Sequence, residues 1–194
     1  MITMEDIKRE YQELLKSIGI DFESICKLTN EEGKIIILGR RWILMDVNAF
    51  PEYMIKSTAN IMGERMAREF IYWFGYSYGE KVAERYLSMG IPKEMIPKIT
   101  AAISTFIAGW GIPEFLELSL VRGRLVVKLH NDFESESAQI NGSEPTNNFF
   151  RGMLAGAFAK LIGAKTHATA EFKDGTTVIV VEKVEHYKAN LKLV

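Results

Sequence analysis

The stretch NNFFRGMLAGAFAKLIGAKTHATAEFKDGTTVIVVEKV, residues 147–184, decides the fold of this chain. Large apolar residues recur in its first half at three- and four-residue spacing, which predicts a helix over Asn148–Ile162 that ends at Gly163. The second half predicts a β-hairpin with strands over 165–172 and 176–184. Asp174-Gly175 between these strands is the sequence of a two-residue hairpin turn.

Glycines lie four residues apart on this helix, at Gly152 and Gly156, and again at Gly75 and Gly79 on an earlier predicted helix. Glycine destabilises an exposed helix interior by ~1 kcal/mol relative to alanine. Two such pairs therefore predict close approach of another backbone. Two interpretations stay open: contact between subunits, or packing of the helix on the sheet within one chain.

The rest of the chain alternates between predicted strands and helices. Gly63 separates a first helix that begins near Pro51 from a longer helix over Glu64–Ser88. Strict alternation of leucine and valine after Pro113 indicates two half-buried antiparallel strands. These elements predict an α+β fold with an antiparallel or mixed sheet packed with a helical layer. The other predicted segments are strands over 34–38 and 41–45, a helix over 93–108, strands over 116–120 and 125–129, and a structureless polar loop over 134–148.

On the long predicted helix, a wide apolar face carries Met66, Phe70, Trp73, Phe74, Ser77 and Val82. Before the first strand, Thr3 and Asp6 resemble a capping box. A helical extension over residues 1–32 is therefore expected, docked on the core or on a partner subunit. Asp21 is expected to cap a second short turn within it.

Composition limits the class of protein. A chain of 194 residues with a formal net charge of -1 fits one domain and has no general attraction for nucleic acid or anionic membranes. Cys26 is the sole cysteine, so no intramolecular disulfide can form and a reducing compartment is expected. The N-terminus contains neither a signal core nor a membrane span. We therefore expect a cytoplasmic protein without membrane insertion.

Several short segments carry a family resemblance: Phe133-Glu134-Ser135-Glu136, Phe150-Arg151-Gly152 with Gly156, Glu171, Gly63-Glu64, Gly75 with Gly79, and Gly109-Trp110-Gly111. In this order they resemble the 4-vinyl reductase domain, of the archaeal predicted hydrocarbon-binding type. The fold of that family is related to subunits of vesicle-tethering complexes. The resemblance implies a ligand-binding domain over 33–194, a cavity between its helical half and its sheet, and a homodimer.

The sequence departs from the family at one place. Many members carry cysteines beside the last hairpin turn and a Cys or His before the packed helix, thought to hold zinc. Here the turn contains no cysteine, and Asn147-Asn148 precede the helix. A structural zinc site usually has four nitrogen or sulfur ligands, and this region supplies only His167. We expect no metal, and no nucleotide-binding motif indicates another cofactor.

Polar residues offer few candidates for catalysis. Glu134 and Glu136 would need a cleft and separated pKa values to act as an acid–base pair. On a polar loop they are expected to be solvated, or to cap a neighbouring backbone. His167 and Glu171 share one side of a strand and form a candidate polar anchor, although a structural role for the histidine fits better. Cys26 is expected to be a buried, inert thiol and His186 to belong to a charged tail.

The function expected from the resemblance is binding of a hydrophobic or aromatic small molecule by a sensor or carrier. Binding pockets are mostly apolar with a few polar anchors, and aromatic and methionine side chains suit them. Two alternatives stay open: an enzyme subunit for reduction of a vinyl-bearing tetrapyrrole, and a protein-interaction scaffold. The candidate ligand-binding residues are Trp73, Tyr76, Phe106, Trp110, Met153 and Phe158.

Overall fold

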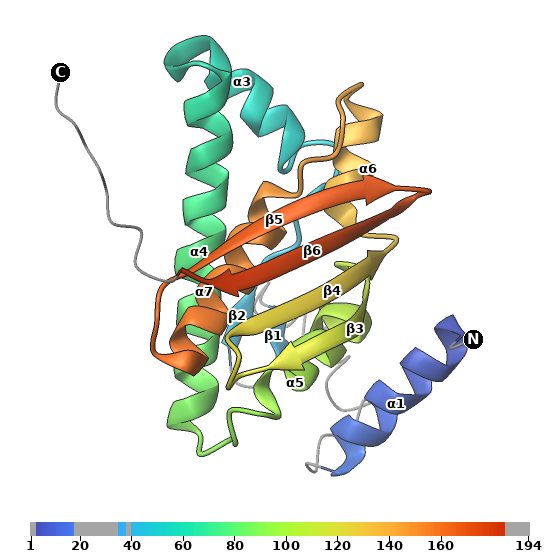
Figure 1. Ribbon diagram of the computed structural model, residues 1–194. Helices are drawn as coiled ribbons and strands as arrows, with labels where there is room; N and C mark the ends of the chain where they lie inside the picture. Colours follow the sequence, from blue (N-terminus) through green and yellow to red (C-terminus); the bar gives the residue numbers. More distant parts are fainter. Residues whose placement is uncertain (1–2, 18–34, 38–39, 185–194) are drawn as a thin grey trace, which may run out of the picture.

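The computed structural model describes residues 3–17, 35–37 and 40–184, and its fold is α+β (Figure 1). The predicted turn at 21–28, Cys26 and His186 lie outside these residues. The helices are α1 (Met4–Ser17), α3 (Glu52–Met62), α4 (Glu64–Ser88), α5 (Ile96–Ile103), a π-helix η1 (Ser104–Ala108), α6 (Phe133–Ile140) and α7 (Asn148–Ile162). The strands are β1 (Ile35–Ile37), β2 (Arg40–Trp42), β3 (Ile112–Ser119), β4 (Arg124–His130), β5 (Thr166–Lys173) and β6 (Thr176–Lys183).

The main sheet has four antiparallel strands in the order β3-β4-β6-β5, and β1 pairs with β2 in a separate two-stranded sheet. Helices α4 and α7 lie behind the main sheet, and α1 lies beside its β3 edge (Figure 1). The predicted hairpin turn is confirmed: Lys173 pairs with Thr176, and Asp174 and Gly175 both have positive φ. Asp-Gly suits these dihedral angles because glycine and aspartate tolerate the left-handed region.

The two glycine pairs face each other inside the chain. A Cβ atom on Gly156 would lie 2.0 Å from the backbone oxygen of Tyr76, and one on Gly79 would lie 2.0 Å from that of Met153. Helices α4 and α7 therefore pack with their backbones in contact. The predicted close approach is confirmed, but both proposed partners were wrong: the glycines meet another helix of the same chain, not the sheet or a second subunit.

This packing determines which face of α4 is buried. Ala67, Gly75, Gly79 and Ala83 are buried, and their small size lets α7 approach. The opposite face carries Met66, Phe70 and Trp73, which are exposed, and Phe74 lies at its edge, where its ring also packs against Phe149 of α7 with centroids 5.8 Å apart. Most of the apolar face found in the sequence is thus the outer face of the helix, but Val82 packs inside against α5.

Several predicted elements differ from the structure. The strand predicted over 41–45 ends as β2 at Trp42. Residues 133–140 of the expected loop form α6, which Asp132 caps by accepting a hydrogen bond from the Ser135 amide at 2.8 Å. The helix expected over 93–108 begins only at Ile96, with Pro97 in its first turn, and changes into the π-helix η1. A β-bulge between Phe115 and Glu117 turns Leu116 outward, so it does not share the buried face of the strand.

The predicted capping box at the start of α1 is confirmed. The Thr3 amide donates to Asp6 Oδ2 at 3.0 Å, and the Asp6 amide donates to Thr3 Oγ1 at 3.1 Å. Ile7 and Tyr11 of α1 are buried against α5 and β3, and the Tyr11 hydroxyl donates to the Pro113 carbonyl. Within the described residues, no helix has the length and apolar character needed to cross a membrane.

Candidate ligand-binding cavity

An apolar cavity lies between the main sheet and the helices that cover it. Leu125, Val127 and Leu129 of β4 form its floor. Side chains from α5 and α7 form the opposite walls, and the segment around Trp110 and Gly111 closes one side. The helical wall residues are Ile96, Pro97, Thr100 and Ala101 from α5, and Phe150, Met153, Leu154, Ala157, Phe158 and Leu161 from α7.

Local sequence explains both the lining and the empty space. Residues of β4 alternate between buried and partly exposed, so every second side chain points to the helices. Small side chains stand at two wall positions, Ala101 on α5 and Ala157 on α7. These short side chains leave room between the helices and the sheet.

The cavity is narrow. Its volume is about 50 Å³. An apolar cavity that holds benzene measures roughly 150 Å³, so a ligand of one ring enters only when side chains of the wall move apart. Two hydroxyl side chains, Thr100 and Ser104, stand in a wall that is otherwise almost wholly apolar.

The π-helix η1 places one of these hydroxyls. Ser104 is buried, and its Oγ donates to the Thr100 carbonyl at 2.9 Å, which leaves the lone pairs of Oγ free to accept a hydrogen bond. The Ser104 carbonyl accepts from the Trp110 amide at 3.0 Å, where the π-helix ends at the left-handed Gly109. Single π-turns are frequent at functional sites because they reposition side chains within a helix.

The six candidate residues fall into two groups. Trp110, Met153 and Phe158 line the cavity. Trp73 is 57% exposed on the outer face of α4 and packs against Tyr76, with ring centroids 5.2 Å apart. Phe106 packs against the α1 cluster. The cavity therefore brings together three of the candidates, and Trp73, Tyr76 and Phe106 lie elsewhere.

The floor on β4 and the wall on α5 were missed by the sequence reasoning. The alternation of Leu125, Val127 and Leu129 already identified an inward face, which could have indicated the floor. Thr100 and Ser104 had no comparable signal, because their position depends on the change from α-helix to π-helix.

A buried polar cluster lies where α6 and α7 begin, beside the end of the last hairpin. Asp132 Oδ1 accepts a hydrogen bond from Asn147 Nδ2 at 2.7 Å, and Asp132 Oδ2 accepts one from Thr177 Oγ1 at 3.2 Å. Ser135 Oγ lies 3.0 Å from Thr177 Oγ1. These bonds satisfy the buried polar groups and hold the start of α6, the start of α7 and β6 together.

Glu134 was expected to be solvated, and that expectation was wrong. Its carboxyl group is buried and accepts hydrogen bonds from the amides of Phe149 at 2.8 Å and Phe150 at 3.0 Å, at the start of α7. The alternative, capping of a neighbouring backbone, is confirmed. Burial raises the pKa of Glu134 to about 8, and the two amides partly oppose this shift.

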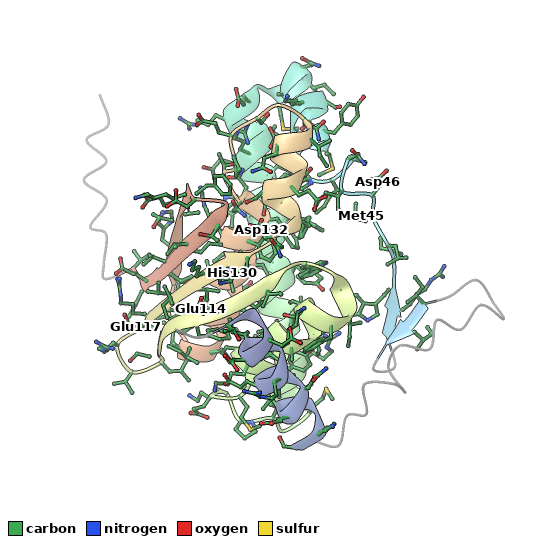
Figure 2. The ribbon with its side chains drawn as sticks, turned by 90° about the vertical axis from the view of Figure 1, so that its right-hand side faces the viewer. Met45, Asp46, Glu114, Glu117, His130 and Asp132 are labelled. Atoms are coloured by element: carbon green, nitrogen blue, oxygen red, sulfur yellow. The ribbon has the colours of Figure 1, made fainter. Side chains whose placement is uncertain are left out.

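Of the two histidines within the described residues, His130 is partly exposed and His167 is exposed. His130 Nε2 lies 2.9 Å from Glu114 Oε2 on the β3–β4 pair, with Asp132 beyond the end of β4 (Figure 2). The two residues of the candidate polar anchor, His167 and Glu171, are exposed on the edge strand β5 and do not reach the cavity lining. Among the described residues, no three His, Cys, Asp or Glu side chains are placed to hold a metal ion.

Solved structures share this fold. The phenol-responsive sensory domain of the transcription activator PoxR, crystallised with phenol, aligns with a TM-score of 0.71 and 18% identity over 97% of this chain and 94% of that one. A vinyl-4-reductase family protein from Methanocaldococcus jannaschii aligns with a TM-score of 0.52 and 17% identity over 95% and 99%.

A trafficking protein particle complex subunit 3 from Naegleria fowleri reaches a TM-score of 0.43 and 12% identity over 70% of this chain and 95% of that one, a likeness too weak to carry an argument. No protein-family model matches the sequence, and no curated protein is significantly similar to it. The likenesses to the sensory domain and to the vinyl-4-reductase family protein therefore identify the fold of this chain.

Proposed function

We propose that this chain is a small-molecule-binding domain that senses or carries a compact hydrophobic or aromatic ligand. The observation that carries the proposal is the apolar cavity between β4, α5 and α7. Enclosure removes apolar surface from water, which contributes ~25 cal/mol per Å². A packed core has few voids larger than a water molecule, and this one is lined almost wholly by apolar side chains.

The shape and polarity of the cavity favour a ligand of about one ring with at most one hydroxyl group. The narrow interior suits a flat molecule, and the free lone pairs of Ser104 Oγ can accept one hydrogen bond from it. The fold neighbour with the higher similarity is a phenol-responsive sensory domain. Its ligand matches this description in size, flatness and its single hydroxyl group.

Contacts between α1 and the cavity wall couple ligand binding to the docking of α1. Ala101 and Phe115 line the cavity and also pack against Ile7 and Tyr11 of α1. The Tyr11 hydroxyl is bonded to the carbonyl of Pro113, which lines the cavity as well. A ligand that supports these wall residues from inside stabilises the docking of α1 from outside. We place the domain in the cytoplasm and take its working form to be a homodimer.

A thermal-shift titration with matched ring compounds tests the proposal. Phenol, toluene, cyclohexanol and naphthalene differ in hydroxyl group, flatness and size. Binding to the folded state alone raises the free energy of unfolding by ~2.7 kcal/mol at about one hundred times the dissociation constant. We expect saturable stabilisation by phenol that exceeds that by toluene, and a loss of this difference in Ser104→Ala. No stabilisation by any compound would leave the scaffold interpretation in place of ligand binding.

A further inference from the structure

The outer face of α4 is apolar and exposed. Met66, Phe70 and Trp73 follow one another at spacings of four and three residues, and all are exposed. We call these residues, together with Phe74 and with Ile61 and Met62 at the end of α3, the outer stripe. Phe74 stands at its edge, where its ring also packs against Phe149 of α7. Phe70 is 53% exposed and Ile61 is 86% exposed. This stripe lies opposite the glycine face that packs on α7.

The stripe is large for a surface that faces only water. Aromatic side chains bury 150–250 Å² when covered, so each half-exposed ring offers roughly 100 Å². With the exposed methionines and Ile61, the stripe amounts to the order of 600 Å² per copy. Stable interfaces bury ~800 Å² per partner, and the charged residues beside the stripe can supply the difference. Exposed apolar patches of this size usually mark an interaction site.

Two charged residues on one edge of the stripe match each other. Arg65 and Glu69 lie one turn apart on the same side of α4, both exposed. Neither forms an ion pair within the part of the chain that the structure describes. The neighbouring Arg68 points the other way and is bonded to Glu52 and Glu64.

We propose that two copies of this chain associate through their outer stripes, as an antiparallel pair of α4 helices related by a two-fold axis level with Arg68. This axis places Met66 of one copy beside Phe70 of the other, and Met62 beside Phe74. A two-fold axis keeps equivalent edges together, so Arg65 of each copy approaches Glu69 of its partner. The spacing of four and three residues is the one that packs two helices side by side.

The two opposite charges beside the outer stripe favour a second copy of this chain over a membrane as its binding partner. An anionic lipid surface attracts a helix with a basic rim, but the rim of the outer stripe carries one basic and one acidic residue, Arg65 and Glu69. The surface rests on the homodimer of the proposed function and is independent of the ligand. A dimer formed here leaves the cavity on the far side of α7 accessible to its own ligand.

The test measures oligomeric state by light scattering and analytical ultracentrifugation on the full chain. We expect a dimer that Phe70→Glu converts into a monomer with unchanged circular dichroism and unchanged stabilisation by phenol. Leu116→Glu is the matched control, because Leu116 is also an apolar side chain that is 53% exposed, on β3. This control should remain dimeric.

A charge exchange makes the test specific for the proposed pairing. Arg65→Glu alone and Glu69→Arg alone should each weaken the dimer about tenfold, because the two-fold axis repeats each contact. The double variant should restore the dissociation constant of the wild type.

A monomeric wild type would overturn both the homodimer and this surface. A dimer that survives Phe70→Glu, or a double variant weaker than either single one, would overturn the surface alone. A monomer that floats with phosphatidylcholine vesicles, and fails to do so as Phe70→Glu, would assign the stripe to a membrane instead. Stabilisation by phenol is measured separately in every case, so loss of the dimer and loss of the ligand are distinguished.

Discussion

Gly156→Ala tests the contact on which the helical layer depends. A Cβ atom at this position would lie 2.0 Å from the Tyr76 oxygen, 2.7 Å from the Tyr76 carbonyl carbon and 2.9 Å from Tyr76 Cα. All three are backbone atoms of α4, so no side-chain rotation can relieve the overlap. The two helices must separate by about 1 Å to reach ordinary contact distances, and every side chain between them loses packing.

The magnitude follows from two opposing effects. Replacing glycine by alanine in a helix favours folding by ~1 kcal/mol. Overpacking of a close contact costs ~1–3 kcal/mol and occasionally more, and here rigid backbone places the cost at the upper end. We expect a net loss of about 2 kcal/mol, which corresponds to a melting temperature lower by roughly 4–8 °C for a chain of this size.

Circular dichroism melting and urea denaturation measure this loss. Ser77→Ala is the control, because Ser77 follows Tyr76 on the exposed side of α4. It should leave the melting temperature unchanged or raise it slightly. A Gly156→Ala variant as stable as the wild type, or more stable, would show that the helices do not touch through these glycines.

Two buried carboxyl groups yield further predictions. Glu134→Gln places an amide NH₂ against one of the amides that now donate to Glu134, so we expect a loss of about 1–3 kcal/mol in urea denaturation, absent in the exposed Glu136→Gln. The folded-state pKa of Glu134 is raised from 4.5 to about 8, so the folded state binds more protons than the unfolded state between these pH values. The free energy of unfolding should therefore fall as the pH rises from 4.5 to about 8 and then level off. Glu134→Gln should lack this slope, and an equal slope in both proteins would contradict the raised pKa of Glu134. Arg68→Ala leaves the buried Glu52 without its two guanidinium contacts at 3.1 and 3.3 Å and should lose about 2–3 kcal/mol, less than a fully buried pair because Arg68 is partly solvated. Arg122→Ala removes an exposed pair with Glu117 and should change the stability by less than about 1 kcal/mol; similar losses in the two arginine variants would refute a structural role for the Arg68 pair.

Local signals in the sequence predicted most of the fold. The Asp174-Gly175 turn, the break at Gly63 and the bounds of α4 each depend on residues close together in the chain, so spacing and turn chemistry were sufficient. The helix α6 was missed because its residues are polar and short of apolar periodicity. It forms because Asp132 caps it and Glu134 bonds to α7. The cap is a local contact that the sequence could have indicated, whereas the bonds of Glu134 to α7 are tertiary.

The site was harder to predict for the same reason. The apolar side chains of α4 indicated one packing face, and the glycines on the opposite side of the helix indicated a second packing face. The sequence alone could not assign which face packs inside the chain, so Trp73 and Tyr76 became cavity candidates. The structure places the glycine face inside and leaves the aromatic face outside, while β4 and α5 supply the walls of the cavity.

The central claim is that a ligand occupies the cavity above β4, and neighbouring residues of that strand permit a direct measurement. Val127 is buried and lines the cavity, whereas the next side chain along the strand, Val126, lies on the opposite face of the sheet. Calorimetric titration measures the binding of phenol to the wild type, Val127→Phe and Val126→Phe. Val127→Phe fills the cavity, and Val126→Phe makes the same substitution on the other face of the sheet. Leu129→Phe provides a second filled cavity if Val127→Phe does not melt cooperatively. We predict saturable binding of phenol by the wild type and Val126→Phe, and at least tenfold weaker binding by the variants with a filled cavity. Equal binding by all of these proteins, or no binding by the wild type, would contradict the claim that a ligand occupies this cavity.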